Sequence, residues 1–367
     1  MLIEQIHYTT TSRYNFPQIL EISSLPERFM ELSLSSMEEI REGSFQPWLN
    51  FVDSSTVKAE DHEDIVEVYG GDKVSLISPL EPIPDATSII AIDASSIRVG
   101  ETENGVICAV RGAVVWNERK RYRYLRLGPF PFHITDENKK EILSLLKCYS
   151  PVGFSSGLSF LIEIQNRLCE ALERWIQMTV STSVSDSIIL LDGSLASRLS
   201  SGHLNILERM LKNARENSNI VLSFSKASTI RFLGRRITEL IVKQRRTCLL
   251  EIDERMLSIS SKRRLRLLGK IYVTKLNGRG YPFRVDIDRV LPKEIQIMAI
   301  QRLLGNELAF QGYPETLRLA HIFSTFTASD VIGIQRFIAR EYGLKVVTWP
   351  SIRKALFGPF GTGGLGD

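Results

Sequence analysis

The sequence predicts a mixed α/β fold, in which helices flank a mixed β-sheet. Short apolar runs at 88–95 and 187–192 have the length and composition of buried strands. In 159–178, apolar residues recur at the three- and four-residue spacing of an amphipathic helix. The predicted order is three strands, followed by helices that alternate with further strands. This order favours a mixed sheet covered by helices, with a helical region before it and an extension after it.

The composition is that of a globular protein. The chain has 367 residues, of which 43% are hydrophobic and 24% charged, enough to bury a large core. No apolar run approaches the ~20 residues of a membrane helix, and the first residues lack the basic and apolar parts of a signal peptide. We therefore expect a cytoplasmic, nucleoid-associated protein without a membrane part. The four cysteines lie far apart without a C-x-x-C pair, which excludes a zinc ribbon and favours free buried thiols.

Charge and turn signals divide the chain into three parts. Residues 1–80 carry 14 acidic against 5 basic residues, and we predict a mostly helical region there that contacts a partner or a second subunit. The proline-rich stretch 80–86 marks the entry to the main domain, 81–345. The tail, 346–367, ends in a glycine-rich run and is expected to be partly flexible.

The main domain is predicted to begin with three strands. Residues 88–95 form the first, and 105–116 and 121–127 are joined by a turn and complete a meander. Thr135 is placed to cap the helix that follows. Further strands are predicted at 187–192, 219–226, 270–276 and 281–287. Helices are predicted at 136–148, 159–178, 203–216, 229–245, 291–304 and in a last segment after Pro314.

Two of the predicted strands end in an aspartate, at Asp93 and Asp192. Carboxylates are rarely buried unless they are paired or hold a metal. Small residues follow each aspartate, and ligands of open α/β sheets bind beyond the carboxyl ends of the strands. Each aspartate alone also suits a turn or a helix cap. Two such strand ends around an acidic helix indicate a metal site.

The order of these elements is that of the ribonuclease-H-like fold. In that fold, carboxylates from the first strand, a helix and the fourth strand hold divalent cations for phosphodiester hydrolysis. Mn²⁺ or Mg²⁺ suits such a site, because hard cations prefer carboxylate oxygens. One ion activates a water and the other stabilises the leaving oxygen.

A basic block follows the second aspartate. Residues 226–270 carry 13 basic against 4 acidic residues, which indicates a phosphate-binding face, although a solvated helix surface has the same signature. Lys226 ends the strand 219–226, where it suits either a phosphate contact or a simple strand end. The predicted DNA-binding residues are Lys226, Arg231, Arg235, Arg236, Arg263, Arg264 and Arg266.

Five segments together resemble the NurA family of nucleases, which work with a HerA-type hexameric DNA translocase. They are IAIDASS, the acidic helix 159–178, LLDGSL, LSFSKAS and GYPETLRLAH. The resemblance covers residues 88–325, with the motifs in the order of the family. It implies a set of catalytic residues: Asp93, Glu170, Asp192, Tyr313 and His321.

In this resemblance, the metal ligands are Asp93, Glu170, Asp192 and His321, and Tyr313 is a polar contact. Glu163 is the alternate to Glu170, because both lie on the same face of the helix. The chain departs from the family at Ala94, where the first motif usually has glycine.

The resemblance implies a nuclease that depends on Mn²⁺ or Mg²⁺. It would degrade single- and double-stranded DNA from 5′ to 3′ and cut single strands internally. It would act as a homodimer on a HerA-like hexamer, in DNA end resection for repair of double-strand breaks by homologous recombination. Two alternatives stay open: a non-catalytic DNA-end-binding assembly factor with the same fold, and a metal-dependent phosphohydrolase of small phosphoesters.

Overall fold

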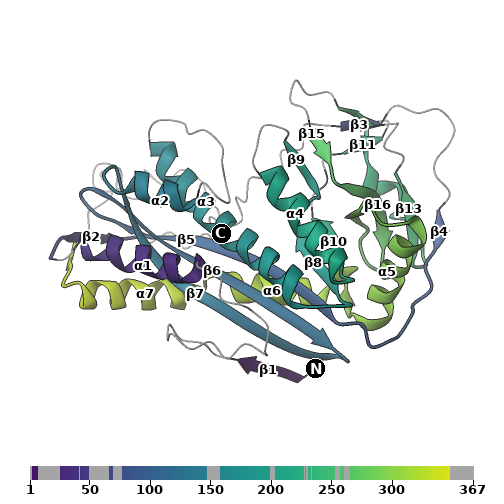
Figure 1. The fold of residues 1–367 in the computed structure, drawn as a ribbon, viewed down its shortest axis with the longest axis horizontal. Helices are drawn as coiled ribbons and strands as arrows, with labels where there is room; N and C mark the ends of the chain where they lie inside the picture. Colours follow the sequence, from purple (N-terminus) through teal and green to yellow (C-terminus); the bar gives the residue numbers. More distant parts are fainter. Residues whose placement is uncertain are drawn as a thin grey trace, which may run out of the picture.

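The computed structural model describes most of the central and C-terminal parts of the chain. The described residues are 2–6, 25–40, 42–48, 66–68, 77–146, 158–198, 203–226, 228, 230–232, 234–252, 257–259 and 265–347. A large mixed sheet runs through them, and helices cover both of its faces (Figure 1). The predicted mixed α/β fold is confirmed.

The centre of the sheet is the predicted meander. Strands β5 (Ile89–Glu101), β6 (Gly105–Glu118) and β7 (Arg121–Thr135) pair antiparallel in chain order. All three are longer than predicted. β7 continues past Pro129, because a bulge between Val110 and Gly112 of β6 accommodates a residue that cannot donate to the ladder.

The sheet continues on the other side of β5. Strands β8 (Ile188–Asp192) and β10 (Ile220–Ser225) run parallel to β5, so their carboxyl ends meet at one edge. Antiparallel strands then complete this side of the sheet: β17 (Phe283–Asp288), β16 (Gly269–Lys275), β13 (Cys248–Glu251) and β4 (Ser78–Pro79). The order β7-β6-β5-β8-β10 is consistent with the predicted ribonuclease-H-like core.

Two sets of helices pack on opposite faces of the sheet. On one face lie α2 (Lys139–Leu146), α3 (Leu158–Ser183) and α4 (His203–Glu216), whose apolar residues share a core with Ile90 and Ile92 of β5. On the other face lie α5 (Lys293–Asn306) and α6 (Glu315–Ser324), which share a core with Ile89 and Ala91. Successive strand residues alternate between the faces, so Asp93 lies on the same face as α6.

The N-terminal elements close one end of the molecule together with the C-terminal ones. Helices α1 (Leu25–Glu38) and α7 (Ala328–Glu341) both lie at this end, where Met37 and Ile338 share a core cluster (Figure 1). Strand β2 (Ser44–Pro47) pairs with both β5 and β20 (Lys345–Val346). Strand β1 (Leu2–Ile6) pairs with β7.

The secondary structure differs from the predictions in several places. The described part of 1–80 is not mostly helical, because it holds four strands besides α1. The predicted helix 229–245 is instead β11 (Arg231–Phe232), β12 (Arg235–Arg236) and the short 3₁₀ helix η2 (Ile237–Ile241). There Gly234 adopts a φ of 78°, and Ile237 and Ile241 are buried against β13 and β16. Helix α7 and strand β13 were not predicted.

The small sheets lie beside the main one. Strands β12 and β11 continue into β3 (Val66–Val68) and β14 (Leu257–Ile259). Strand β15 (Leu265–Leu267) pairs with β9 (Ala196–Arg198). Within the described residues, no helix has the length and apolarity to cross a membrane. Three cysteines are described, Cys108, Cys169 and Cys248; as predicted, they are buried thiols, and none forms a disulfide within the described residues.

Candidate active site

The side chain of Asp93 is almost completely buried, and two residues of α6 contact it. The hydroxyl of Ser324 donates to Oδ2 of Asp93 over 2.6 Å, and Nδ1 of His321 lies 3.1 Å from the same oxygen. Asp93 is only 1% exposed. A carboxylate buried to this degree is stable only with such polar partners. Asp93 lies within β5 and not at its end as predicted, and the structure brings it together with the predicted histidine.

The contact with Asp93 orients the ring of His321. A carboxylate accepts hydrogen bonds, so Nδ1 donates and Nε2 is left as the basic nitrogen. The side chain of His321 is 38% exposed, which keeps the ring within reach of a ligand. This nitrogen is suited either to bind a cation or to accept a proton from a water.

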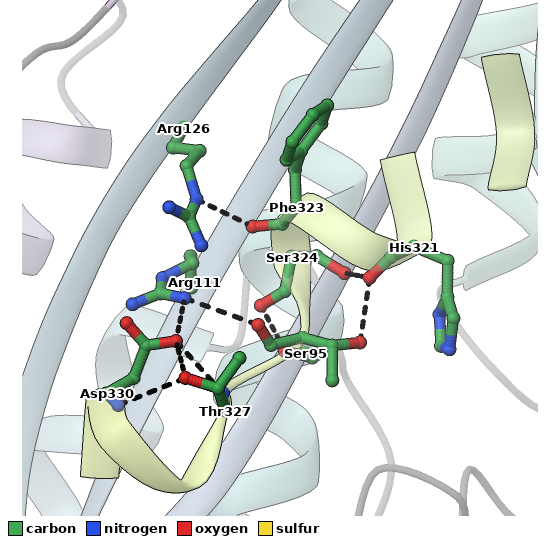
Figure 2. Close-up of polar contacts among 9 residues, drawn as sticks. Ser95, Arg111, Arg126, His321, Phe323, Ser324, Thr327 and Asp330 are labelled. Carbon is green, nitrogen blue, oxygen red and sulfur yellow. Dashed lines mark hydrogen bonds and ion pairs between the residues drawn. The ribbon is translucent and has the colours of Figure 1, made fainter. Parts of the chain in front are cut away.

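The carboxyl end of α6 is fixed by donors from the three strands of the meander (Figure 2). Arg126 donates to the carbonyl of Phe323 over 2.9 Å, and Ser95 donates to the carbonyl of Ser324 over 2.5 Å. Arg111 donates to the carbonyl of Thr325 over 3.3 Å. The last carbonyls of a helix have no partners within the helix, so these donors satisfy them and set the position of α6.

Arg111 also connects α6 to α7. Its guanidinium binds Asp330 over 3.3 Å and lies 4.2 Å from the ring centre of Phe326. Asp330 forms a capping box with Thr327 at the start of α7. Burial lowers the pKa of the Arg111 guanidinium, and the hydrogen bond that it donates to Asp330 opposes this effect. In Figure 2, the ring of His321 points away from Arg111, so Arg111 acts on His321 only through the helix.

Asp192 is the last residue of β8, and Lys226, just beyond β10, neutralises it. Nζ of Lys226 lies 2.7 Å from Oδ2 of Asp192. The loop after Asp192 is held to β10, because the Gly193 amide donates to the carbonyl of Phe224 over 2.8 Å and Ser225 donates to the Gly193 carbonyl over 2.7 Å. The predicted phosphate-binding lysine therefore lies at the predicted acidic site.

Tyr313 lies on a hairpin beside both aspartates. Strands β18 (Ala309–Phe310) and β19 (Tyr313–Pro314) are joined by Gln311 and Gly312, whose φ values of 52° and 93° are those of a type I′ turn. A Cβ on Gly312 would meet the carbonyl oxygen of Tyr281 at 2.3 Å, so the sequence requires glycine there.

The hydroxyl of Tyr313 is buried without a hydrogen-bond partner among the described residues. Its ring packs at 5.3 Å from Phe283 and 6.2 Å from Phe224, measured between ring centres. Burial raises the pKa of Tyr313 well above its ordinary value, and the charges of Asp192 and Asp93 raise it further. The negative charges of both carboxylates therefore oppose ionisation of this hydroxyl.

The helix glutamates are placed differently. Glu170 and Glu163 lie on α3, which packs on the face of the sheet opposite to α6 and the Asp93 side chain. Glu163 forms an ion pair with Arg167, one turn further along the helix. The roles of Glu170 and of its alternate, Glu163, stay predictions.

The groups of the candidate site are of the kind that a hard divalent cation binds. Asp93 and Asp192 supply carboxylates, His321 supplies an imidazole nitrogen, and the Tyr313 hydroxyl has no other described partner. The described residues contain no ready group of three His, Cys, Asp or Glu side chains for a metal. Mg²⁺ is commonly held by one or two carboxylates plus waters and substrate phosphates, and such binding needs no larger protein group.

The predicted DNA-binding arginines are divided between two places. Arg231, Arg235 and Arg236 lie on β11 and β12 of the four-stranded sheet, where Arg235 and Arg236 are exposed. Arg266 lies on β15 beside α4 and forms an ion pair with Glu208 over 2.9 Å. Arg263 and Arg264 lie outside the described residues, and their role stays a prediction.

Comparison with known proteins identifies the family. The model of the NurA domain matches residues 87–323, well over half of the chain. The chain belongs to the NurA family. This confirms the resemblance that the sequence motifs predicted, and the match includes both aspartates, Tyr313 and His321.

Solved structures of NurA proteins are similar to this one. The NurA nuclease from Sulfolobus solfataricus is 21% identical, with coverage of 76% of this chain and 91% of that one and a TM-score of 0.47. A NurA structure bound to dAMP and manganese is 8% identical, with coverage of 69% and 88% and a TM-score of 0.37. The search of curated proteins finds no match.

Two residues at this NurA-family site were missed by the sequence analysis. Ser324 follows His321 by three residues, so its place on the same helix face was a usable signal. Arg111 had no such signal, because its partners Thr325 and Asp330 are more than 200 residues away in the chain.

Proposed function

We propose that this protein is a nuclease that hydrolyses DNA with the help of a divalent metal ion. The observation that carries the proposal is the set of contacts at the two aspartates: His321 lies 3.1 Å from the buried Asp93, and Lys226 lies 2.7 Å from Asp192 and 5.6 Å from the ring centre of Tyr313. Membership of the NurA family and the NurA structure bound to dAMP and manganese support it. Mn²⁺ or Mg²⁺ would be held by Asp93 and Asp192, with His321 and a helix glutamate as further predicted ligands.

When bound, the metal supplies an activated water and neutralises charge that develops on the scissile phosphate. The side chains of the protein position the reacting groups and can transfer a proton. Asp93 holds the imidazole of His321 in position, and Ser324 holds the carboxylate of Asp93. Nε2 of His321 is then available to accept or return a proton. Lys226 lies between Asp192 and the ring of Tyr313, 5.6 Å from its centre, where its ammonium can meet a phosphate oxygen.

The proposal is tested with end-labelled single- and double-stranded DNA in the presence of Mn²⁺. The wild type is compared with Asp93→Asn, Asp192→Asn and a matched control, Asp136→Asn, whose carboxylate is exposed and bonded only locally to Lys139. We expect cleavage by the wild type and the control, and a loss of at least about 100-fold in the two site variants. Full activity in either site variant would remove that residue from the site.

The same experiment separates the two alternative functions. Retained DNA binding with no cleavage under Mn²⁺ or Mg²⁺ would favour a non-catalytic end-binding factor. Hydrolysis of small phosphoesters without cleavage of DNA would favour a phosphohydrolase. The paired Asp192 and Lys226 fit a charged polymer, because a lysine beside the carboxylate offers a phosphate contact next to the cleavage site.

The finer properties remain part of the proposal. They are 5′ to 3′ exonuclease action, internal cutting of single strands, a homodimer, and assembly on a HerA-like hexamer for end resection in double-strand break repair. Labels at the 5′ or the 3′ end distinguish the direction of degradation. Light scattering of the purified protein, alone and with the hexamer, measures the two assemblies.

A further inference from the structure

A groove of about 520 Å³ lies between α4, β15 with the residue after it, and the end of β17. Leu211 of α4 and Leu268, both buried in the core of this face, form part of its lining. The groove is therefore on the α4 face of the sheet, whereas the side chain of Asp93 contacts α6 on the other face. It forms no part of the carboxylate site.

The walls of this groove, hereafter the α4 groove, are strongly basic. Five cationic side chains line it against two acidic ones: Arg209, Lys212, Arg215, Arg266 and Arg289, against Glu208 and Asp288. The first three lie at three-residue intervals on α4. Such spacing advances about 4.5 Å along the helix per step, so the three charges form a row rather than a point.

The acidic residues of the groove are already used in holding its arginines. Asp288, with a side chain only 3% exposed, pairs with Arg215, and Glu208 pairs with Arg266 over 2.9 Å. Arg289 donates to the carbonyl of Leu267 over 2.9 Å. These contacts order the walls, while Arg209 and Lys212 are exposed, and Lys212 lies 3.6 Å from the exposed carboxylate of Glu216. A surplus of positive charge is thus presented to solvent along one side of the groove.

The chain connects this groove directly to the carboxylate site. After Asp192, it runs to Ser197 of β9, which pairs with Arg266 of β15. Five residues span at most about 18 Å, and paired Cα atoms are about 5 Å apart. Arg266 is therefore within about 23 Å of Asp192, which is about seven nucleotides of a strand at 3.4 Å each.

We propose that the α4 groove binds the phosphodiester backbone of a nucleic-acid strand, several nucleotides away from the bond at Asp192. The proposal rests on the proposed nuclease function for the identity of the strand. A row of cations beside an apolar floor fits a chain of phosphates whose sugars and bases contact the floor. A single small anion would use only one or two of these charges.

The test measures binding of labelled single-stranded DNA by fluorescence anisotropy in EDTA, so that no cleavage occurs. Strands of about 5 and about 25 nucleotides are compared, because the longer one covers the whole span of up to about 23 Å between Asp192 and the groove. The variant is Arg209→Gln with Lys212→Gln. The matched control is Arg336→Gln with Arg340→Gln, which removes two exposed charges from α7. Circular dichroism shows that both variants are folded.

For the groove variant, we expect at least about fivefold weaker binding of the long strand and a salt slope reduced by about 1.4, since each phosphate contact contributes ~0.7. Binding of the short strand should be unchanged, and the control should bind both strands like the wild type. Equal losses in the control, equal losses for both strands, or no loss would each overturn the proposal. Poly-glutamate that competes as well as DNA, charge for charge, would overturn the choice of nucleic acid.

This readout is independent of cleavage. A protein that shows the expected length-dependent binding but never cuts DNA would contradict the proposed nuclease and leave the groove assignment intact. If the protein cuts DNA normally but the groove variant binds the long strand like the wild type, the groove assignment is contradicted and the proposed nuclease function is left intact.

Discussion

The guanidinium of Arg111 binds the carbonyl of Thr325 at the carboxyl end of α6, and this contact connects the centre of the sheet to the helix that carries His321 (Figure 2). Arg111 is 4% exposed and lies on β6, next to the strand of Asp93. We infer that Arg111 is a positioning residue, which holds His321 at Asp93 without contacting either.

Replacement of Arg111 by methionine should therefore lower kcat by about 10- to 100-fold with little change in KM, because a misplacement of ~1 Å costs about 100-fold. Arg111→Lys should recover part of the loss, since it restores one donor. Nuclease kinetics and the free energy of unfolding are measured together. A core variant such as Ile338→Val, which only weakens the fold, is the comparison. If Ile338→Val loses as much activity as the Arg111 to methionine variant for the same loss of stability, Arg111 has only a structural role.

Gly312→Ala should disrupt the hairpin that presents Tyr313. The new Cβ would lie 2.3 Å from the carbonyl oxygen of Tyr281, in a residue whose φ is 93°. We expect a loss of about 1–3 kcal/mol of stability and most of the activity. Gly343→Ala is the matched control, because its φ of 63° is also positive but nothing lies within 4 Å of its Cβ. Equal effects of the two substitutions on cleavage would contradict the role of the close contact.

Tyr313→Phe should separate activity from stability. The hydroxyl is buried without a described partner, so its removal should leave the fold as stable as before, or more stable by about 1 kcal/mol. Activity should fall, because the charges of both aspartates act on this hydroxyl and Nζ of Lys226 lies 5.6 Å from the centre of its ring. Denaturant unfolding and DNA cleavage are measured on the same preparation. A variant with wild-type cleavage would show that the hydroxyl takes no part in the reaction.

His133 should make the stability of the protein depend on pH. Burial lowers the pKa of this β7 side chain from 6.5 to about 4, and its Nδ1 has no described partner. The unfolded chain therefore takes up this proton first as pH falls. The contribution to stability is complete above pH 6.5 and is lost as pH falls from 6.5 to 4, by up to ~1.4 kcal/mol per pH unit.

Urea unfolding at pH values from 7.5 down to 4.5 checks this prediction. His133→Gln removes the titrating group, so its stability should fall less steeply than that of the wild type between pH 6.5 and 4. Carboxylates titrate in both proteins and cancel in the difference. Parallel curves for the two proteins would show that His133 is not the group responsible.

Much of the fold was predictable because local patterns and tertiary packing agree. The run SIILLD became β8, and the periodic segment at 203–216 became α4, since each has one clear apolar pattern. The prediction of a helix at 229–245 was wrong because the local pattern and the tertiary packing disagree there. Its isoleucines suit a helix, but burial of Ile237 and Ile241 against the main sheet decides the structure there.

The site was predictable only in part. Asp93 and Asp192 stand out as charged residues at the ends of apolar runs, and the sequence motifs added Tyr313 and His321. The face on which each strand side chain lies, which separates Asp93 from α3, follows from the sheet rather than from any motif. The residues that fix the site, Arg111 and Ser95, contact the α6–α7 segment more than 200 residues away, and no local pattern marks such a contact.

The pairing of β2 with β20 sets a condition on the order of folding. Ser44 and Lys345 are partners although 300 residues separate them, and the Glu42 amide also donates to the carbonyl of Tyr342. During synthesis the chain emerges from its N-terminus, so β2 must wait for nearly all of the protein before its outer edge is covered. Until then, that edge is an unpaired strand, the kind of surface on which newly made chains aggregate.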